Sequence, residues 1–395
     1  MKICLFNCTQ DGSTGSIVKN LAVQYQKMGH QVLCVFGQKK QDWASVPCLF
    51  TIKNSFEKYR NKFESRWDGR DGFVNTSGTK MILLEIAKFH PDIFHLHNMH
   101  GEWINIENVI NFAKNNGIQV CMTAHDCWIE TGRCAHYKFN KCNQYITKCG
   151  RCPHRLSYPK TYLFDRSRHF WYKKRKIISG IKLIFTPSHW LANEIRGAGI
   201  ETPLEVIGTP YCEKEFFPIK REEQFQTPTI GFCSFVWDET KGLSMAQMIA
   251  HHYIKMGYRV IFIGMNPSDS RLPKGAKGIA KTKDRQQMAD LYRSFDCFVN
   301  PTRQDTHSTT NIEAMACGTP VVTSRCCGCY EMLTDKWKEG VVEEYALNSF
   351  IKKIDFMLQR GRIPIPTDLN LFQSIEFAKN TIEEYRALLS NRELK

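Results

Sequence analysis

The chain has 395 residues, of which 42% are hydrophobic and 24% charged, so it is an ordinary globular chain long enough for two or three domains. Its 54 Lys and Arg residues outnumber its 39 Asp and Glu residues by 15, which favours anionic partners such as phosphates, nucleic acid or anionic lipid without choosing among them. No apolar run reaches the roughly 18 residues of a membrane span, and the start at Met1 does not resemble a signal peptide, so we expect a cytoplasmic protein.

Strand-like and helix-like patterns alternate along the chain, which predicts an α/β protein with parallel sheets. In the first half the pattern predicts strands at 2–7, 31–36, 93–96, 119–123, 182–186 and 204–207, and helices at 15–28, 80–89, 106–115 and 188–196. The polar stretch 50–78 lacks periodicity and is expected to be irregular. In the second half we expect strands at 229–233, 259–263, 297–299 and 321–322, and helices at 243–256, 285–294, after 309, and throughout the remainder, ending with 380–390.

Two carboxylates, Asp305 and Glu313, stand eight positions apart at a loop-to-helix junction. Thr310 and Glu313 have the spacing of a capping box, in which Glu313 would only satisfy the start of the helix. The alternative is binding, because a helix N-terminus attracts phosphate and carboxylates accept hydrogen bonds from sugar hydroxyls. The spacing alone leaves both interpretations open.

The run from Glu313 to Val322, Glu-Ala-Met-Ala-Cys-Gly-Thr-Pro-Val-Val, resembles the signature of the retaining GT-B glycosyltransferases. The likeness extends over essentially the whole chain, is strongest at 229–322, and looks closest to a subgroup of polysaccharide-assembly transferases with Asp at the first acidic position. It implies two Rossmann-like domains facing a central cleft. It also implies that Glu313 holds the ribose of a nucleotide-sugar and that Asp305 holds the donor sugar. The sequence departs from the family where His307-Ser308-Thr309 replaces the usual Gly-Phe-Gly.

The resemblance also implies a domain plan. Residues 1–208 are expected to form the acceptor-side domain, with a cysteine-rich insertion at 127–153. Residues 209–375 are expected to bind the nucleotide-sugar, and 376–395 to form a helix that packs back on the body. The polar, aperiodic stretch 208–227 is independently a candidate boundary.

Further donor contacts follow from the family pattern. Lys241, in a Lys-Gly pair after the first strand of the second half, would neutralise the donor diphosphate, with a plain surface lysine as the alternative. The arginine that the family usually carries about five positions earlier is absent, and Arg325, Lys283 and Arg303 are candidates to replace it. The remaining expected donor contacts are Gly12 and Gly15 in the first glycine loop, together with Ser308, Thr309 and Thr310.

Two histidines follow strands of the first half. The family has Thr-x-His where this chain has Thr123-Ala124-His125, so His125 is the candidate catalytic residue beside the reacting carbon, together with Asp305 and Glu313. Asp126 is expected to orient His125 or to bind the acceptor, and His97 is placed on the acceptor side with a structural role as its alternative. The resemblance implies no general protein nucleophile, and without an Asp-x-Asp at a strand end no metal is expected for catalysis.

A cluster of cysteines follows directly after Asp126. Cys134, Cys142, Cys149 and Cys152 have the spacing Cys-x7-Cys-x6-Cys-x2-Cys, which suits either a structural zinc or a set of reduced thiols that pack a loop. Five other cysteines stand singly in apolar strands, where they are expected to act as small hydrophobes; these are Cys4, Cys34, Cys121, Cys233 and Cys297.

The segment from Arg166 to Lys176 interleaves basic and aromatic residues, which is typical of a surface for anionic lipid or nucleic acid, or of a solvated helix with Trp171 buried. The family resemblance favours the membrane. We therefore expect a peripheral, hexosyltransferase-type enzyme that adds a sugar to a growing, lipid-linked surface glycan such as an exopolysaccharide. The alternatives are a nucleotide-sugar epimerase of the same fold, a basic non-catalytic binding protein, and a degenerate transferase.

Overall fold

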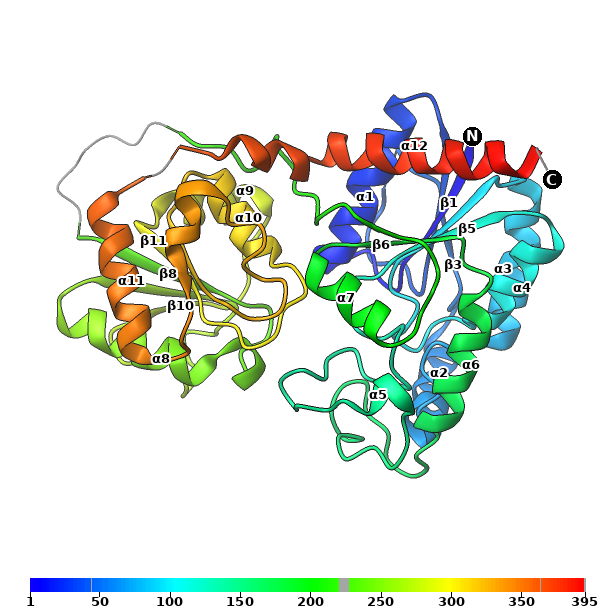
Figure 1. The fold of residues 1–395 in the computed structure, drawn as a ribbon, viewed down its shortest axis with the longest axis horizontal. Coiled ribbons are helices and arrows are strands. Elements are labelled where there is room, and N and C mark those ends of the chain that lie inside the picture. Colours follow the sequence, from blue (N-terminus) through cyan, green and yellow to red (C-terminus); the bar gives the residue numbers. More distant parts are fainter. Residues whose placement is uncertain (44, 220–226, 363, 394–395) are drawn as a thin grey trace. The chain divides into compact units, whose positions relative to one another are not determined.

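The computed structural model describes residues 1–43, 45–219, 227–362 and 364–393, and it divides the chain into two compact units (Figure 1). Unit 1 combines Met1–Ile207 with Ser374–Lys395, and unit 2 is Gly208–Gln373. The sequence placed the corresponding breaks after residues 208 and 375.

Unit 1 is built on a seven-stranded parallel sheet in the order β3-β2-β1-β4-β5-β6-β7. The strands are β1 (Lys2–Phe6), β2 (Gln31–Phe36), β3 (Cys48–Phe50), β4 (Ile93–Leu96), β5 (Gln119–Thr123), β6 (Leu183–Thr186) and β7 (Leu204–Val206). The helices are α1 (Gly12–Lys27), α2 (Ser55–Asp68), α3 (Thr76–Phe89), α4 (Ile106–Asn115), α5 (Gln144–Thr147), α6 (Ser167–Ile178), α7 (His189–Gly197) and the C-terminal α12 (Ser374–Glu393).

Unit 2 has a six-stranded parallel sheet in the order β10-β9-β8-β11-β12-β13. The strands are β8 (Thr229–Cys233), β9 (Arg259–Ile263), β10 (Lys277–Ile279), β11 (Cys297–Asn300), β12 (Val321–Ser324) and β13 (Val341–Val342). The helices are η1 (Glu239–Lys241), α8 (Leu243–Lys255), α9 (Arg285–Ser294), α10 (Thr309–Ala316), η2 (Asp335–Gly340), α11 (Leu347–Arg360) and η3 (Thr367–Phe372).

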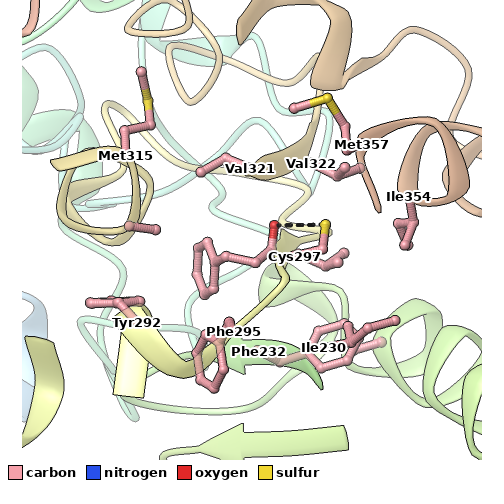
Figure 2. Packing of buried hydrophobic residues seen from close by; sticks show 14 of the residues in the cluster. Ile230, Phe232, Tyr292, Phe295, Cys297, Met315, Val321, Val322, Ile354 and Met357 are labelled. Atoms are coloured by element: carbon pink, nitrogen blue, oxygen red, sulfur yellow. Dashed lines mark hydrogen bonds between the residues drawn. The ribbon is translucent and has the colours of Figure 1, made fainter. Parts of the chain in front are cut away.

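The apolar strands form the cores, because a parallel sheet is covered by helices on both faces. In unit 2, Met315 of α10 and Ile354 of α11 belong to the same buried cluster as the strand residues Ile230 and Val321 (Figure 2). The expectation that isolated strand cysteines act as small hydrophobes is confirmed by four that are fully buried, Cys4, Cys34, Cys121 and Cys297.

Helix α12 lies against α1 in unit 1, and a buried chain of hydroxyl groups ties it to the sheet. The Tyr385 hydroxyl lies 2.5 Å from His95 Nδ1 of β4 and 3.2 Å from the Tyr25 hydroxyl of α1. Tyr25 in turn contacts the Thr381 hydroxyl at 2.6 Å. The last helix of the chain therefore completes the first unit rather than the second.

The expectation of an irregular segment at 50–78 is wrong, because this segment contains α2 and the start of α3. Helix α2 has a regular start, where the Asn54 side chain accepts a hydrogen bond from Glu57 N at 2.9 Å. The helix buries polar residues and exposes its aromatic ones, so it lacks the apolar stripe by which a helix is usually predicted. Three edge strands of two or three residues, β3, β10 and β13, also escaped prediction, since such short runs carry no periodicity.

Candidate functional site

Each sheet reverses its strand order at one point, and ligands of open α/β sheets bind outside the carboxyl ends of the strands at that point. In unit 1 the reversal lies between β1 and β4, and in unit 2 it lies between β8 and β11. The loops that follow these four strands carry most of the predicted site residues, so the topology selects the same regions as the motifs.

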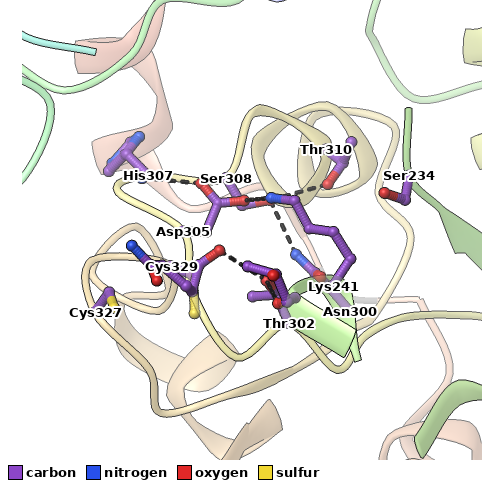
Figure 3. A network of polar contacts seen from close by, with 12 residues as sticks. Ser234, Lys241, Asn300, Thr302, Asp305, His307, Ser308, Thr310, Cys327 and Cys329 are labelled. Atoms are coloured by element: carbon purple, nitrogen blue, oxygen red, sulfur yellow. Dashed lines mark hydrogen bonds and ion pairs between the residues drawn. The ribbon is translucent and has the colours of Figure 1, made fainter. Parts of the chain in front are cut away.

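In unit 2 the predicted donor residues Lys241 and Asp305 form an ion pair (Figure 3). Lys241 Nζ donates to Asp305 Oδ2 at 2.9 Å, and both side chains retain partial exposure, 37% and 20%. Gly242 makes this approach possible, since it adopts φ 73° and an added Cβ would lie 1.9 Å from Pro301 O. A cation and a carboxylate, both still accessible, thus stand together at the β8/β11 switch point.

The start of α10 adjoins this pair. Ser308 is the N-cap residue, but its side chain does not cap the helix; its hydroxyl instead lies 2.9 Å from the Thr310 hydroxyl and accepts from Asn300 Nδ2 at 2.9 Å. The hydroxyls are therefore held by one another and by β11, while the helix N-terminus supplies its backbone N–H groups. This arrangement suits an anion such as a phosphate.

Glu313 does not cap α10, so the capping-box interpretation is wrong. It lies in the middle of the helix, 7% exposed, with Oε1 3.1 Å from Arg285 Nη2 and Oε2 accepting from the Tyr292 hydroxyl at 3.2 Å. Burial raises the pKa of the Glu313 carboxyl, although Arg285 and Tyr292 partly offset this. Since each carboxylate oxygen has two acceptor positions, two remain available for a diol.

Arg285 is a residue that the sequence analysis missed. It bridges two carboxylates, because its Nε donates to Glu215 Oε2 at 3.0 Å while its Nη2 reaches Glu313. Of the three cations named as substitutes for the absent arginine of the phosphate site, Arg325 pairs with Glu343, Arg303 lies over the Tyr345 ring, and the backbone N–H of Lys283 donates to Gln287. Their role at the phosphate site stays a prediction. The position of Arg285 in the first turn of α9 was the one feature of the sequence by which it could have been found.

His307, which departs from the family pattern, is buried beside Asp305. Its ring lies 5.4 Å from that of Phe372, and burial lowers its pKa to about 4 despite the neighbouring carboxylate. Among the described residues its Nδ1 has no hydrogen-bond partner. A buried N–H group without an acceptor is costly, so we assign the neutral tautomer of His307 in which Nδ1 carries no proton.

In unit 1 the loop from β1 to α1 depends on two glycines. Gly12 has φ 76°, a left-handed conformation that favours glycine, and its missing side chain leaves open space. At Gly15 an added Cβ would lie only 2.3 Å from Gln10 O, so α1 can approach the loop this closely only with glycine. Gly12 therefore leaves bare backbone exposed at the β1/β4 switch point, whereas the buried Gly15 allows the close packing of α1 against the loop.

His97 and His125 are brought together at the ends of β4 and β5. His97 Nδ1 lies 2.9 Å from His125 Nε2, and burial lowers the pKa of His125 to about 4 although the Asp126 charge opposes this. Both rings are therefore neutral near pH 7. Because His97 Nε2 is buried and has no partner among the described residues, the least costly tautomer has His97 Nδ1–H donating to His125 Nε2.

Asp126 forms an ion pair with His100, and the expectation that it orients His125 or binds the acceptor stays a prediction. Asp126 Oδ2 lies 2.7 Å from His100 Nε2, and His100 Nδ1 lies 3.1 Å from the Tyr158 hydroxyl. Burial disfavours the charged form of both groups, but the charge of each group stabilises the charge of the other by more. The pKa of His100 is therefore raised and that of Asp126 is lowered. His100 was missed, although it stands three positions after His97 in the same loop.

Cys134, Cys142, Cys149 and Cys152 line one cavity of about 20 Å³. Gly132 N donates to Cys149 Sγ at 3.2 Å, and a hydrogen bond from Cys134 lowers the pKa of Cys152 to about 6. Within the described residues, however, no group of three or more His, Cys, Asp or Glu side chains is arranged to hold a metal ion. The structural zinc therefore stays a prediction.

Two of the three Phe, Trp and Tyr rings in the segment from Arg166 to Lys176 are directed inward. This segment forms most of α6, and Phe170, Trp171 and Lys174 are 3%, 8% and 1% exposed, whereas Tyr172 is 53% exposed. The interpretation as a solvated helix with Trp171 buried fits the structure, and the expected membrane contact stays a prediction. In the part of the chain that the structure describes, no helix has the length and apolar character needed to cross a bilayer.

Comparison with protein families gives two matches. The model described as "Glycosyltransferase Family 4" matches residues 14–211, and that described as "Glycosyl transferases group 1" matches residues 227–360. The chain belongs to these glycosyltransferases. No curated protein sequence matches this glycosyltransferase.

Solved structures share its fold over nearly their whole length. Sucrose-phosphate synthase from Thermosynechococcus elongatus has a TM-score of 0.71 at 14% identity, covering 99% of this chain and 100% of that one. Anabaena Alr3699/HepE in complex with UDP-glucose has a TM-score of 0.62 at 11% identity, again covering 99% and 100%. The lipopolysaccharide outer core galactosyltransferase WaaB gives the same values. The predicted fold class, two Rossmann-like α/β domains of the GT-B type, is confirmed.

Proposed function

We propose that this glycosyltransferase moves a hexose from a nucleotide-sugar to a growing, lipid-linked surface polysaccharide or oligosaccharide, with retention of the anomeric configuration. The observation that carries the proposal is the ion pair of Lys241 and Asp305 beside the N-terminus of α10. A nucleotide-sugar needs a cation for its diphosphate and hydrogen-bond acceptors for its sugar hydroxyls, and this pair offers both at a switch point.

Each predicted donor residue has a task that its geometry allows. Lys241 leaves Asp305 to neutralise the diphosphate, which stabilises the leaving group as the glycosidic bond breaks. The N–H groups at the start of α10, with Ser308, Thr309 and Thr310, bind phosphate oxygens. Asp305 accepts from the sugar hydroxyls, and Glu313, held by Arg285, accepts from the ribose diol.

Retention follows from attack on the same face as the leaving group. The bond between the anomeric carbon and the phosphate oxygen breaks while a bond to the acceptor oxygen forms. The acceptor's proton passes to the departing phosphate, so no protein base is required. We assign the neutral His125 the role of a hydrogen-bond partner of the donor sugar, and we assign Asp126, His100 and His97, which lie near it in unit 1, to acceptor binding.

The choice of donor and acceptor has weaker support. The Anabaena structure contains UDP-glucose, which favours a uridine diphosphate sugar. The family resemblance to polysaccharide-assembly transferases favours a lipid-linked acceptor at the inner face of the membrane. No observation on the described residues favours an epimerase or a nucleic-acid-binding protein.

A thermal-shift screen of nucleoside diphosphates and their sugars tests the proposal. A donor present at about 100 times its dissociation constant stabilises a protein by about 2.7 kcal/mol, so the correct nucleotide should give a clear rise in melting temperature. Lys241→Met should remove that rise, whereas Lys352→Met, at an exposed position of α11, should keep it.

A second experiment tests the stereochemistry. The identified donor is incubated with acceptor, and the anomeric configuration of the product is determined by NMR. Stabilisation by oligonucleotides alone, or an inverted product, would overturn the assignment.

A further inference from the structure

Helix α2 exposes the side chains that a helix normally buries. Phe56, Tyr59, Phe63 and Trp67 are 74%, 66%, 62% and 40% exposed, and their spacing of three or four positions places them along one face. The residues that α2 does bury are Asn61, Ser65 and Asp68. This inverted pattern leaves a row of aromatic rings in contact with solvent.

A second segment of unit 1, residues 156–164, extends the row of exposed apolar side chains. Tyr162 N donates to Arg66 O at 2.7 Å, and Phe164 N donates to Trp67 O at 3.0 Å, so the segment runs along the end of α2. The Trp67 ring lies 5.9 Å from that of Phe164 and 5.2 Å from that of Phe63. This segment adds further exposed apolar side chains, which are Leu156 (60%), Tyr162 (47%), Leu163 (50%) and Phe164 (57%). Together, the eight apolar residues of α2 and this segment are here named the aromatic face.

Basic residues outnumber acidic ones in the two segments that carry the aromatic face. Residues 53–70 and 155–166 hold nine Lys and Arg residues and four Asp and Glu residues, so their formal charge is +5 (nine minus four). Of the four carboxylates, Asp68 is buried and pairs with Arg70 and Arg166. The charge of these segments is therefore positive, as is that of the whole chain.

This combination identifies the chemistry of the partner. Aromatic rings bordered by Lys and Arg are the composition of a helix that lies in the interface of an anionic bilayer. Aromatic rings also stack on sugars, but Leu156 and Leu163 have no ring to stack, whereas both would enter an acyl layer. We propose that the aromatic face docks unit 1 on a membrane surface that contains anionic lipid.

The assignment differs from the sequence-based one, which used the segment from Arg166 to Lys176. In that segment Phe170 and Trp171 are buried and Tyr172 alone of the Phe, Trp and Tyr rings is exposed, whereas all four rings of α2 are exposed. Docking would give the enzyme access to a lipid-linked acceptor, and this part of the inference rests on the proposed function. Membrane binding is independent of that function, because it can be measured without donor or acceptor.

The test is co-sedimentation of the full chain with mixed phosphatidylglycerol–phosphatidylcholine vesicles and with pure phosphatidylcholine vesicles. The protein should bind the mixed vesicles, and added salt should weaken binding because it screens the charges. The triple variant Phe56→Ser, Tyr59→Ser, Phe63→Ser should bind about tenfold more weakly. Its melting temperature should stay near that of the wild type, since all three side chains are more than 60% exposed.

A matched control removes exposed apolar side chains from another helix of unit 1. Met81 and Leu84 of α3 are 52% and 66% exposed, and Met81→Ser with Leu84→Ser should leave vesicle binding unchanged. Equal binding to both vesicle types, or no loss in the triple variant, would overturn the proposal. The proposal would also be overturned if the protein did not bind vesicles and its aromatic face instead bound a soluble glycan. The same holds if the face formed a dimer interface that the triple variant abolished.

Discussion

At the scale of single residues, each carboxylate of the candidate donor site is held by a cation from a distant part of unit 2. Asp305 is bound by Lys241, and Glu313 is bound by Arg285. The first cation is in position to move to a diphosphate, because it and its partner are partly exposed. The second is anchored at Glu215 as well, so Glu313 keeps its orientation with or without ligand.

Replacement of Glu313 tests its role in donor binding. Glu313→Gln keeps the shape but removes the charge that would accept from the ribose, and hydrogen bonds to charged groups contribute about 1.5–3 kcal/mol. We expect kcat/KM to fall roughly tenfold to hundredfold without loss of the folded state. The control, Asp290→Asn, changes a carboxylate of α9 that is 58% exposed and does not contact Arg285, and activity should stay close to that of the wild type. Full activity in Glu313→Gln would contradict the assignment.

The ion pair of Asp126 and His100 predicts a pH-dependent stability. The raised pKa of His100 means that its contribution is fully present below its unfolded pKa, about 6.5, and is lost as the pH rises through its folded pKa. The lowered pKa of Asp126 means that its contribution is present above about 3.9 and is lost as the pH falls through its folded pKa.

The melting temperatures of the wild type and Asp126→Asn should therefore differ most between about pH 4 and 6.5, and the difference should shrink at higher pH. Differential scanning fluorimetry across this range measures the effect. His251→Asn, at an exposed position of α8, serves as the control and should give a small difference at every pH. A difference for Asp126→Asn that grows above neutral pH would show that the pair is not charged.

At the scale of elements, two helices depart from the amphipathic rule, each because of what it contacts. The buried residues of α10 include both the polar Glu313 and the apolar Met315, since the helix packs into the core of unit 2 while it carries a site residue. Helix α2 buries polar residues and exposes rings. Such exceptions are expected where an element serves binding rather than packing.

The cysteine insertion carries a prediction of metal content. If Cys134, Cys142, Cys149 and Cys152 hold a structural zinc, elemental analysis of the purified chain should give about one zinc per molecule. Cys142→Ser with Cys149→Ser should then lose the metal, whereas Cys326→Ser in unit 2 should keep it. Less than about 0.2 zinc per chain would contradict a tight site and leave the thiols as packing groups.

At the scale of the whole molecule, the chain crosses from unit 1 to unit 2 and returns with α12. The return places Tyr385 in the middle of unit 1, where its hydroxyl meets His95 and Tyr25. The stability of unit 1 therefore depends on the last residues of the chain, whereas unit 2 is continuous in sequence.

Tyr385→Phe should loosen unit 1 alone. Loss of the hydroxyl leaves the buried His95 Nδ1 without its partner, whereas Tyr25 keeps its contact with Thr381, and such an unsatisfied group costs about 1–3 kcal/mol. Hydrogen exchange should speed up in the strands of unit 1 and remain unchanged in those of unit 2. Tyr253→Phe gives the reciprocal control, because its hydroxyl donates to Asp355 within unit 2 at 2.7 Å. Faster exchange in both units for either variant would contradict their independence.

The sequence by itself determined the fold class, because alternating apolar strands and amphipathic helices require parallel sheets covered on both faces. It also identified Asp305, Glu313 and Lys241 as candidates, because the short runs around them resemble the motifs of a known family. Local patterns suffice wherever neighbours in space are also neighbours in sequence, as at the Ser188 cap, whose side chain accepts from Leu191 N at 3.2 Å.

Only the tertiary structure decided which charges meet. The pairs Lys241–Asp305, Arg285–Glu313 and His100–Asp126 join residues 64, 28 and 26 positions apart, and no local pattern encodes such contacts. It also decided which aromatic side chains face solvent, because α2 and α6 have similar basic and aromatic compositions but opposite burial. Composition predicts a helix's preferences, whereas exposure depends on what the rest of the chain places against it.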